Sequence, residues 1–242
     1  MADTEFISVY HRDGVLRRRG LFLPGEVAEI RRAFDRYDAS RQYLPVGDFT
    51  LESDGQTVRN YWRMQDHDPY FRSLAERPSL LDLVAPLVRG MPQVMGVESF
   101  NKPAAVGSPV PWHQDNAYFC QSPPDVLTVW IALDPATEEN GAVEYLLGSH
   151  HDLFSHVPSG IRGNSFGIAD DHPLDGYRRF LGIVDPGDVL VHHCQTIHGS
   201  QPNRSSRPRL SLVIVYRANH TRTDPTLQAE YHRAVSLTPP GG

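Results

Sequence analysis

Two histidines and an aspartate have the types and spacing of a metal site. His113 and Asp115 lie two residues apart in a segment that favours an extended strand, so their side chains point to the same side. His198 comes from a distant segment and would complete three ligands on one face of a metal ion. Two histidines and one carboxylate suit non-haem Fe(II), because this arrangement leaves coordination positions open for a co-substrate and O2.

The third ligand has two rivals in the same stretch of the chain. His192 and His193 end an apolar segment shortly before His198. We prefer His198 because Arg209, a candidate anion-binding residue, follows it. We expect His192 to be a core residue or to support a ligand, and His193 to be a structural neighbour.

Arg209 begins the most apolar strand-like segment of the chain. An arginine there is costly to bury without an anion. Its guanidinium could therefore hold the far carboxylate of a dicarboxylate co-substrate. Ser211 shares that face of a strand and could donate its hydroxyl to the same anion. The alternative for Arg209 is an ordinary salt bridge to one of the 29 acidic residues.

Polar and aromatic residues flank the His113–Asp115 pair and are candidates for substrate binding. Gln114, Asn116 and Tyr118 could face the metal and give the pocket polar handles and an aromatic wall. The alternative is that they form turns and pack against the core.

Residues 91–217 have the residue pattern of a β-sheet protein. Runs rich in Val, Ile, Thr, Tyr and Trp alternate with Gly, Pro and Asn-Gly punctuation. We expect strands at 93–100, 109–115, 126–133, 142–147, 188–192 and 209–216. So many short strands predict a sandwich or jelly roll.

The remaining segments are expected to flank this core within a single domain, 1–242. Residues 1–90 look mainly helical, with an amphipathic helix over 24–40 and a further helix that Asp68 would cap. Residues 150–182 lack a pattern and predict either a lid or a crossover helix. Residues 218–242 form a C-terminal extension.

Composition limits the classes of partner. The chain has 242 residues, a net charge of −6 and a pI near 6.0, which argues against nucleic-acid binding. The N-terminus lacks an apolar leader and no window is apolar enough to span a membrane, so we expect a cytoplasmic protein without a membrane partner. Cys120 and Cys194 are expected to be free thiols.

Several motifs, taken together and in this order, resemble the phytanoyl-CoA dioxygenase family over roughly residues 60–217. They are Trp112-His113-Gln114-Asp115, Thr128-Val129-Trp130-Ile131-Ala132-Leu133, Glu139-Asn140-Gly141-Ala142, Gly148-Ser149-His150, Gly187-Asp188, His198-Gly199-Ser200, Asn203 and Arg209. One departure is Leu147, where the family usually has proline before the Gly-Ser-His motif, and it should alter a turn rather than the chemistry.

The resemblance implies an Fe(II)- and 2-oxoglutarate-dependent dioxygenase on a double-stranded β-helix, a cupin-like jelly roll with flanking helices. By this resemblance, His113, Asp115 and His198 would bind iron. Arg209, supported by Ser211, would bind the C5 carboxylate of 2-oxoglutarate, and Trp130 and Lys102 would line the co-substrate pocket. It implies no catalytic residue beyond the metal ligands. The carboxylate of Asp115 disfavours halogenation.

The implied activity is hydroxylation of a C–H bond in a small metabolite, such as a natural-product intermediate, an amino-acid derivative or a phosphonate. Two alternatives use the same ligands: a non-catalytic metal-binding β-barrel for binding or sensing, and a zinc hydrolase. Neither alternative requires Arg209 or Trp130, so these two residues favour the oxygenase.

Overall fold

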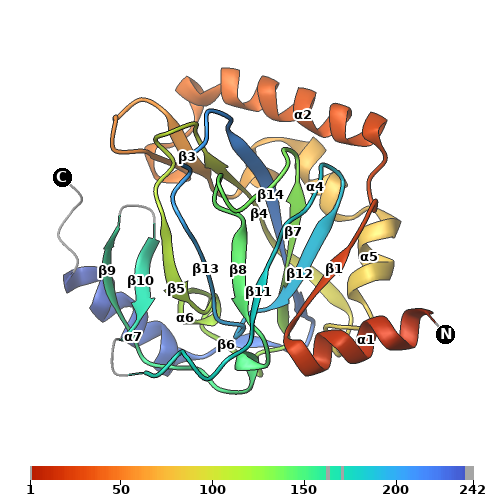
Figure 1. The fold of residues 1–242 in the computed structure, drawn as a ribbon, viewed down its shortest axis with the longest axis vertical. Helices are drawn as coiled ribbons and strands as arrows, with labels where there is room; N and C mark the ends of the chain where they lie inside the picture. The colour runs from red at the N-terminus through yellow and green to blue at the C-terminus, as the bar shows by residue number, and fades with distance from the viewer. Residues whose placement is uncertain (1, 162–163, 170–171, 238–242) are drawn as a thin grey trace.

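Two facing antiparallel sheets form the centre of the protein, which confirms the expected jelly roll. A computed structural model describes residues 2–161, 164–169 and 172–237 (Figure 1).

The larger sheet has seven strands in the order β1-β12-β7-β14-β4-β3-β2, and the smaller has four in the order β11-β8-β13-β5. The larger sheet comprises β1 (Val15–Arg18), β12 (Val189–His193), β7 (Val126–Ala132), β14 (Arg209–Ala218), β4 (Pro92–Lys102), β3 (Val58–Tyr61) and β2 (Phe49–Leu51). The smaller comprises β11 (Arg179–Leu181), β8 (Val143–Leu146), β13 (His198–Ser200) and β5 (Val110–His113).

The central strands of the larger sheet are buried on both faces. Along β14, Leu212 and Ile214 pack into one hydrophobic cluster and Val213 and Val215 into another. Both faces therefore need apolar residues, which explains the nearly continuous apolar run of this strand. One face meets helices, and the other faces the smaller sheet and the cavity between the sheets.

Helices cover the outer face of the larger sheet (Figure 1). These are α2 (Pro24–Ala39), α4 (Pro69–Ala75) and α5 (Pro78–Val84). The amphipathic helix expected over 24–40 is confirmed as α2, and its apolar stripe joins the main core. Asp68 caps α4 as expected, because its carboxylate accepts a hydrogen bond from the backbone N–H of Tyr70 at 2.8 Å.

The N-terminal segment also supplies strands, so the expectation of a mainly helical 1–90 was incomplete. Strands β1, β2 and β3 join the larger sheet, and β1 pairs with β12. These strands have three or four residues each. Tertiary pairing forms them, since such short segments show no clear alternation of their own. The remaining helices of this segment are α1 (Ala2–Asp13), α3 (Met64–His67), η1 (Arg41–Tyr43) and η2 (Val46–Asp48).

The segment 150–182 forms strands, and its described residues contain no crossover helix, so that alternative was wrong. Strands β9 (His156–Ile161) and β10 (Asn164–Ile168) pair as a hairpin, and β11 joins the smaller sheet. The short helix η3 (Ser149–His151) precedes them. The lid interpretation stays a prediction.

The C-terminal segment lies beside the hairpin. Helix α7 (Pro225–Leu237) contacts β9 and the short helix α6 (Asn116–Phe119), and β15 (Arg222–Thr223) pairs with β6 (Gln121–Ser122). Residues 238–242 of the expected extension lie outside the described residues. None of the described helices is both long and apolar enough to cross a membrane. Cys120 and Cys194 are free, as expected, and both are buried.

The turn before β8 requires a residue without a side chain at position 141. The φ of Gly141 is +79°, and an added Cβ would clash with the backbone oxygen of Gln201. Gly55 has a similar φ of +69° with open space around it, so Gly55→Ala measures the backbone strain alone. We expect Gly141→Ala to lower the free energy of unfolding by about 2 kcal/mol more than Gly55→Ala, measured by urea denaturation. Equal losses would contradict this packing constraint.

Candidate metal centre

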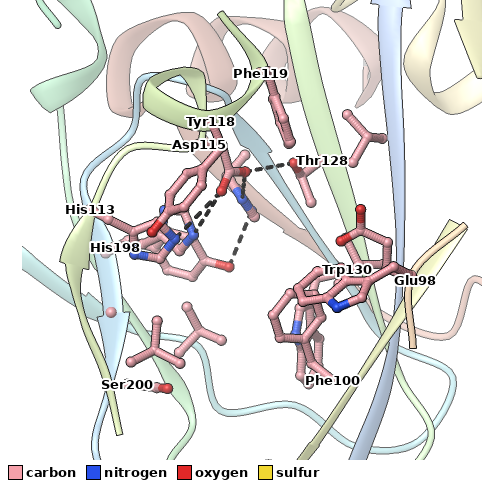
Figure 2. A pocket seen from close by; sticks show the side chains of 18 of the residues that line it. Glu98, Phe100, His113, Asp115, Tyr118, Phe119, Thr128, Trp130, His198 and Ser200 are labelled. Carbon is pink, nitrogen blue, oxygen red and sulfur yellow. Dashed lines mark hydrogen bonds and ion pairs between the residues drawn. The ribbon is translucent and has the colours of Figure 1, made fainter. Parts of the chain in front are cut away.

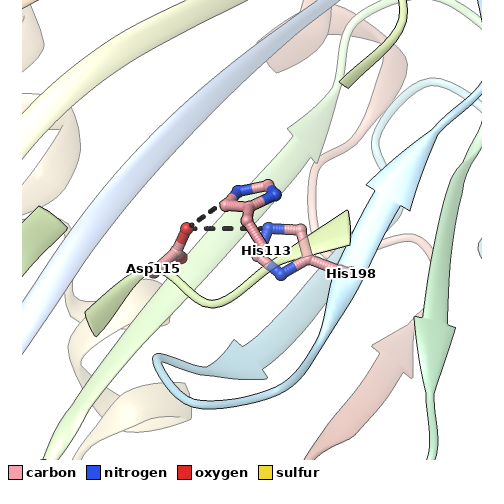
Figure 3. Close-up of side chains that lie close together, drawn as sticks. All are labelled: His113, Asp115 and His198. Carbon is pink, nitrogen blue, oxygen red and sulfur yellow. Dashed lines mark ion pairs between the residues drawn. The ribbon is translucent and has the colours of Figure 1, made fainter. Parts of the chain in front are cut away.

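The register of two strands brings the three predicted ligands together. His198, at the start of β13, pairs directly with His113, at the end of β5, and Asp115 follows two residues later. Oδ1 of Asp115 lies 3.5 Å from Nε2 of His113 and 3.6 Å from Nε2 of His198 (Figure 3). One ligand atom from each residue falls within 4.8 Å of the others, which is the spacing a shared metal ion requires.

Backbone contacts fix both histidine rings in a metal-binding orientation. Nδ1 of His113 lies 2.9 Å from the backbone oxygen of Pro111, and Nδ1 of His198 lies 2.9 Å from that of Thr196. Each Nδ1–H can donate to its carbonyl, so each Nε2 keeps a lone pair directed at the centre. Burial and the neighbouring His113 lower the pKa of His198 well below its usual value.

The carboxylate of Asp115 is held by its second oxygen. Oδ2 accepts a hydrogen bond from Oγ1 of Thr128 at 2.8 Å and lies 3.1 Å from Nε2 of His192. Burial alone would raise the pKa of Asp115, but the histidines around it, His198 foremost, bring that pKa well below its usual value. The group is therefore ionised, with Oδ1 free for a metal.

The two rival histidines have other positions. His192 contacts Asp115 through Nε2, and its Nδ1 lies 3.3 Å from the hydroxyl of Tyr145, so His192 supports the carboxylate. His193 packs against Tyr10 and His150 and does not line the cavity. Burial lowers the pKa of His193 to about 3, as expected for a neutral structural residue.

A cavity of about 480 Å³ opens beside the three ligands, between the two sheets (Figure 2). Its wall is mainly aromatic and apolar, with a few polar groups. Besides the three candidate ligands, the lining residues are Thr50, Trp62, Glu98, Phe100, Val110, Tyr118, Phe119, Thr128, Trp130, Val143, Tyr145, His192, Gly199, Ser200, Arg209, Val213, Val215 and Tyr231.

Arg209 is a buried cation without a carboxylate partner. The residue is 2% exposed, its guanidinium carbon lies 5.4 Å from the ring centre of Trp130, and Nη1 donates to the backbone oxygen of Gly141. Its Nε has no hydrogen-bond partner, and the ion pairs among the described residues do not include it. The expected alternative, a salt bridge, is therefore not found there. Burial lowers the pKa of Arg209 to about 10, which is the effect of an uncompensated charge.

Two residues expected at the co-substrate lie behind the cavity wall. Nζ of Lys102 donates to the backbone oxygens of Ser108 and Gln201, both at 2.7 Å, and Oγ of Ser211 donates to that of Phe100 at 3.0 Å. Neither Lys102 nor Ser211 lines the cavity. The polar atoms of both side chains are therefore directed at backbone oxygens and not at the cavity where a co-substrate would lie. They hold the backbone around Arg209.

Two of the three predicted substrate contacts do not line the cavity. Gln114 is 0% exposed, and its amide donates to the backbone oxygens of Asp152 and Gln195. Asn116 exchanges two hydrogen bonds with the backbone of Gln121. Both amides are therefore used inside the protein. The ring of Tyr118 does line the cavity, edge-on to His113 at 5.8 Å, although its hydroxyl bonds to the backbone of Phe166.

The structure adds cavity residues to which the sequence analysis gave no role. Thr128 holds the carboxylate of Asp115, Ser200 adds a hydroxyl to the cavity wall, and Glu98 adds a carboxyl. Tyr231 reaches the cavity from α7 and packs 5.5 Å from Phe166 of the β9–β10 hairpin. Periodicity would have placed Glu98 and Ser200 on inward faces, but not their neighbours across the cavity.

Comparison with known proteins agrees with the geometry. The family model for phytanoyl-CoA dioxygenase (PhyH) matches residues 10–211. A probable alpha-ketoglutarate-dependent hypophosphite dioxygenase from Stutzerimonas stutzeri is 32% identical, covering 86% of this chain and 76% of its own. The L-proline trans-4-hydroxylase of Streptomyces griseoviridis is 29% identical, covering 89% of this chain and 87% of its own.

Solved structures share the fold. The iron-bound crystal structure of EctD from S. alaskensis superposes with a TM-score of 0.79 at 21% identity, covering 90% of this chain and 77% of its own. The epimerase SnoN, in complex with Fe3+, alpha ketoglutarate and nogalamycin RO, gives a TM-score of 0.77 at 24% identity, covering 95% and 89%. Together with the family match over residues 10–211, these findings establish that the chain belongs to the phytanoyl-CoA dioxygenase family of 2-oxoglutarate-dependent iron dioxygenases.

Proposed function

We propose that this dioxygenase hydroxylates a C–H bond of a small metabolite, with His113, Asp115 and His198 as the ligands of Fe(II). The observation that carries the proposal is the pairing of this triad with Arg209 across one cavity. A zinc hydrolase or a binding protein would need the triad but not a buried, unpaired guanidinium beside it.

The residues fit the two groups that the family uses. Two imidazole nitrogens and one carboxylate oxygen on one side of an ion are the donor set of non-haem Fe(II) oxygenases. The unpartnered Nε of Arg209 suits one carboxylate of 2-oxoglutarate. When bound, iron and 2-oxoglutarate supply O2 activation, in which one oxygen atom enters the substrate and the other enters succinate as CO2 leaves.

The protein's own part is to orient and to exclude water. Thr128 and His192 hold the carboxylate of Asp115, so that ligand keeps its position without iron. Trp130 covers the guanidinium of Arg209, and Val213 and Val215 form an apolar floor. A dry, rigid wall strengthens the charge contacts of the site and keeps the target C–H in one orientation.

The primary substrate is proposed to be small. Relatives act on hypophosphite, proline and ectoine according to their names. A cavity of about 480 Å³ that also takes 2-oxoglutarate leaves room for a compact molecule. A natural-product intermediate or an amino-acid derivative fits this size. We also place the enzyme in the cytoplasm, in keeping with its two free, buried cysteines.

His113→Ala tests the metal ligand directly. The change removes one donor nitrogen, so we expect succinate formation from 2-oxoglutarate to fall by more than about a hundredfold, beyond the range for residues that only support a ligand. The measurement is succinate release with Fe(II) added. His151→Ala is the control, since His151 is exposed. Undiminished turnover in His113→Ala would defeat the assignment.

Arg209→Ala tests the co-substrate contact. Loss of a charge-assisted pair should raise the KM for 2-oxoglutarate about ten- to hundredfold, while kcat at saturation changes less. Arg207→Ala removes the same charge from an exposed neighbour and should leave the KM unchanged. A KM in Arg209→Ala equal to that of the unaltered protein would rule out this role.

Thr128→Val tests the support of Asp115. The substitution keeps the shape but removes the hydroxyl that donates to Oδ2. We expect the affinity for Fe(II), measured by anaerobic calorimetry, to fall about tenfold or more. Thr128→Ser keeps the hydroxyl and should bind iron within a few-fold of the unaltered protein. If both variants bind equally, the hydroxyl does not position the carboxylate.

A further inference from the structure

Glu98 faces the cavity from the inner face of the larger sheet. In the register of the sheet, Glu98 on β4 lies opposite Val213 on β14, which lies opposite Trp130 on β7. All three line the cavity. Figure 2 shows the Glu98 carboxyl on the side of the cavity that carries Trp130 and Phe100, across from His113 and His198.

No partner of the Glu98 carboxyl is found among the described residues. The hydrogen bonds and ion pairs of the cavity wall, such as those of Asp115 with Thr128 and His192, do not include Glu98. Burial, with a contribution from Asp115, raises the pKa of Glu98 to about 8. Ionising this group inside the protein is therefore costly, and a cation bound next to it would recover that cost.

Aromatic rings line the cavity on the side of this carboxyl. Phe100 shares its face of β4, two residues along, and Trp62 packs edge-on to Phe100 with ring centres 5.6 Å apart. Aromatic faces attract cations, and the indole N–H of Trp62 donates to Oγ1 of Thr50 rather than to this carboxyl. A carboxyl among aromatic rings suits an ammonium group better than an anion or a neutral hydroxyl compound.

Charge balance points the same way. Fe(II) carries two positive charges and 2-oxoglutarate two negative ones, and Asp115 and Arg209 cancel each other. The loaded site would thus be neutral without Glu98. With Glu98 protonated, as its raised pKa favours, the site stays neutral. An ammonium ion would let Glu98 ionise and would balance the charge this creates, because Arg209 is the only Lys or Arg side chain in the described lining.

We propose that Glu98 binds a basic nitrogen of the primary substrate, so that the enzyme acts on a small amine bound as its ammonium ion. This inference rests on the proposed function and narrows its substrate class. Glu98 then sets specificity, and it takes no part in iron or 2-oxoglutarate binding.

Matched probes test the inference by direct binding. Cyclohexylamine is a cation at neutral pH, and cyclohexanol is its uncharged counterpart of nearly equal shape. With Fe(II) and 2-oxoglutarate present without O2, we expect calorimetry to give the amine at least about tenfold tighter binding than the alcohol, as for a charge-assisted hydrogen bond. Glu98→Gln should remove this preference, and Glu138→Gln, which removes an exposed carboxylate, should keep it.

Three outcomes would overturn the proposal: equal binding of amine and alcohol, no binding of the amine, or a preference that survives in Glu98→Gln. Glu98→Gln removes an unpaired carboxyl, so it should unfold at no lower temperature than the unaltered protein, which shows that the variant is folded. Iron and 2-oxoglutarate are titrated separately in the same protein. Their failure to bind would count against the proposed function, whereas loss of the amine preference alone would count only against Glu98.

Discussion

The site depends on one cross-strand pair, His113 opposite His198. Residues paired in antiparallel strands have side chains about 5 Å apart, so a single register fixes both imidazoles beside one point in space. A slip of one residue would turn either ring to the other face of the sheet. Asp115 then needs only to follow β5 by two residues, and the hydrogen bonds from Thr128 and His192 hold it in place.

Buried charge is the second organising feature, and it is arranged in opposite signs across the cavity. Arg209 is a cation without a carboxylate partner, whereas Asp115 is an anion surrounded by histidines. Each arrangement costs folding free energy that an apolar residue would not. Groups kept at such a cost commonly serve ligands. The enclosing sheets and outer helices supply the apolar burial that offsets it.

Much of this was predictable from sequence because it follows from local chemistry. Long strands such as β7 and β14 can be recognised from their runs of β-branched residues. The triad can be recognised from its residue types and their spacing. The alternation of side chains along a strand also predicts the position of Gln114. Because Gln114 lies between His113 and Asp115, which point toward the metal site, its own side chain must point away from it. Strands β1 to β3 are too short to show a pattern, and the surroundings of a carboxyl such as Glu98 depend on three strands meeting in one register.

The most direct test of the central claim is the visible absorption spectrum of the protein with Fe(II) and 2-oxoglutarate in the absence of O2. If the triad holds iron and the cavity holds the co-substrate against it, a weak charge-transfer band appears only when both are added. A protein that binds zinc in a closed cage, or that shows no band with both additions, would contradict the account.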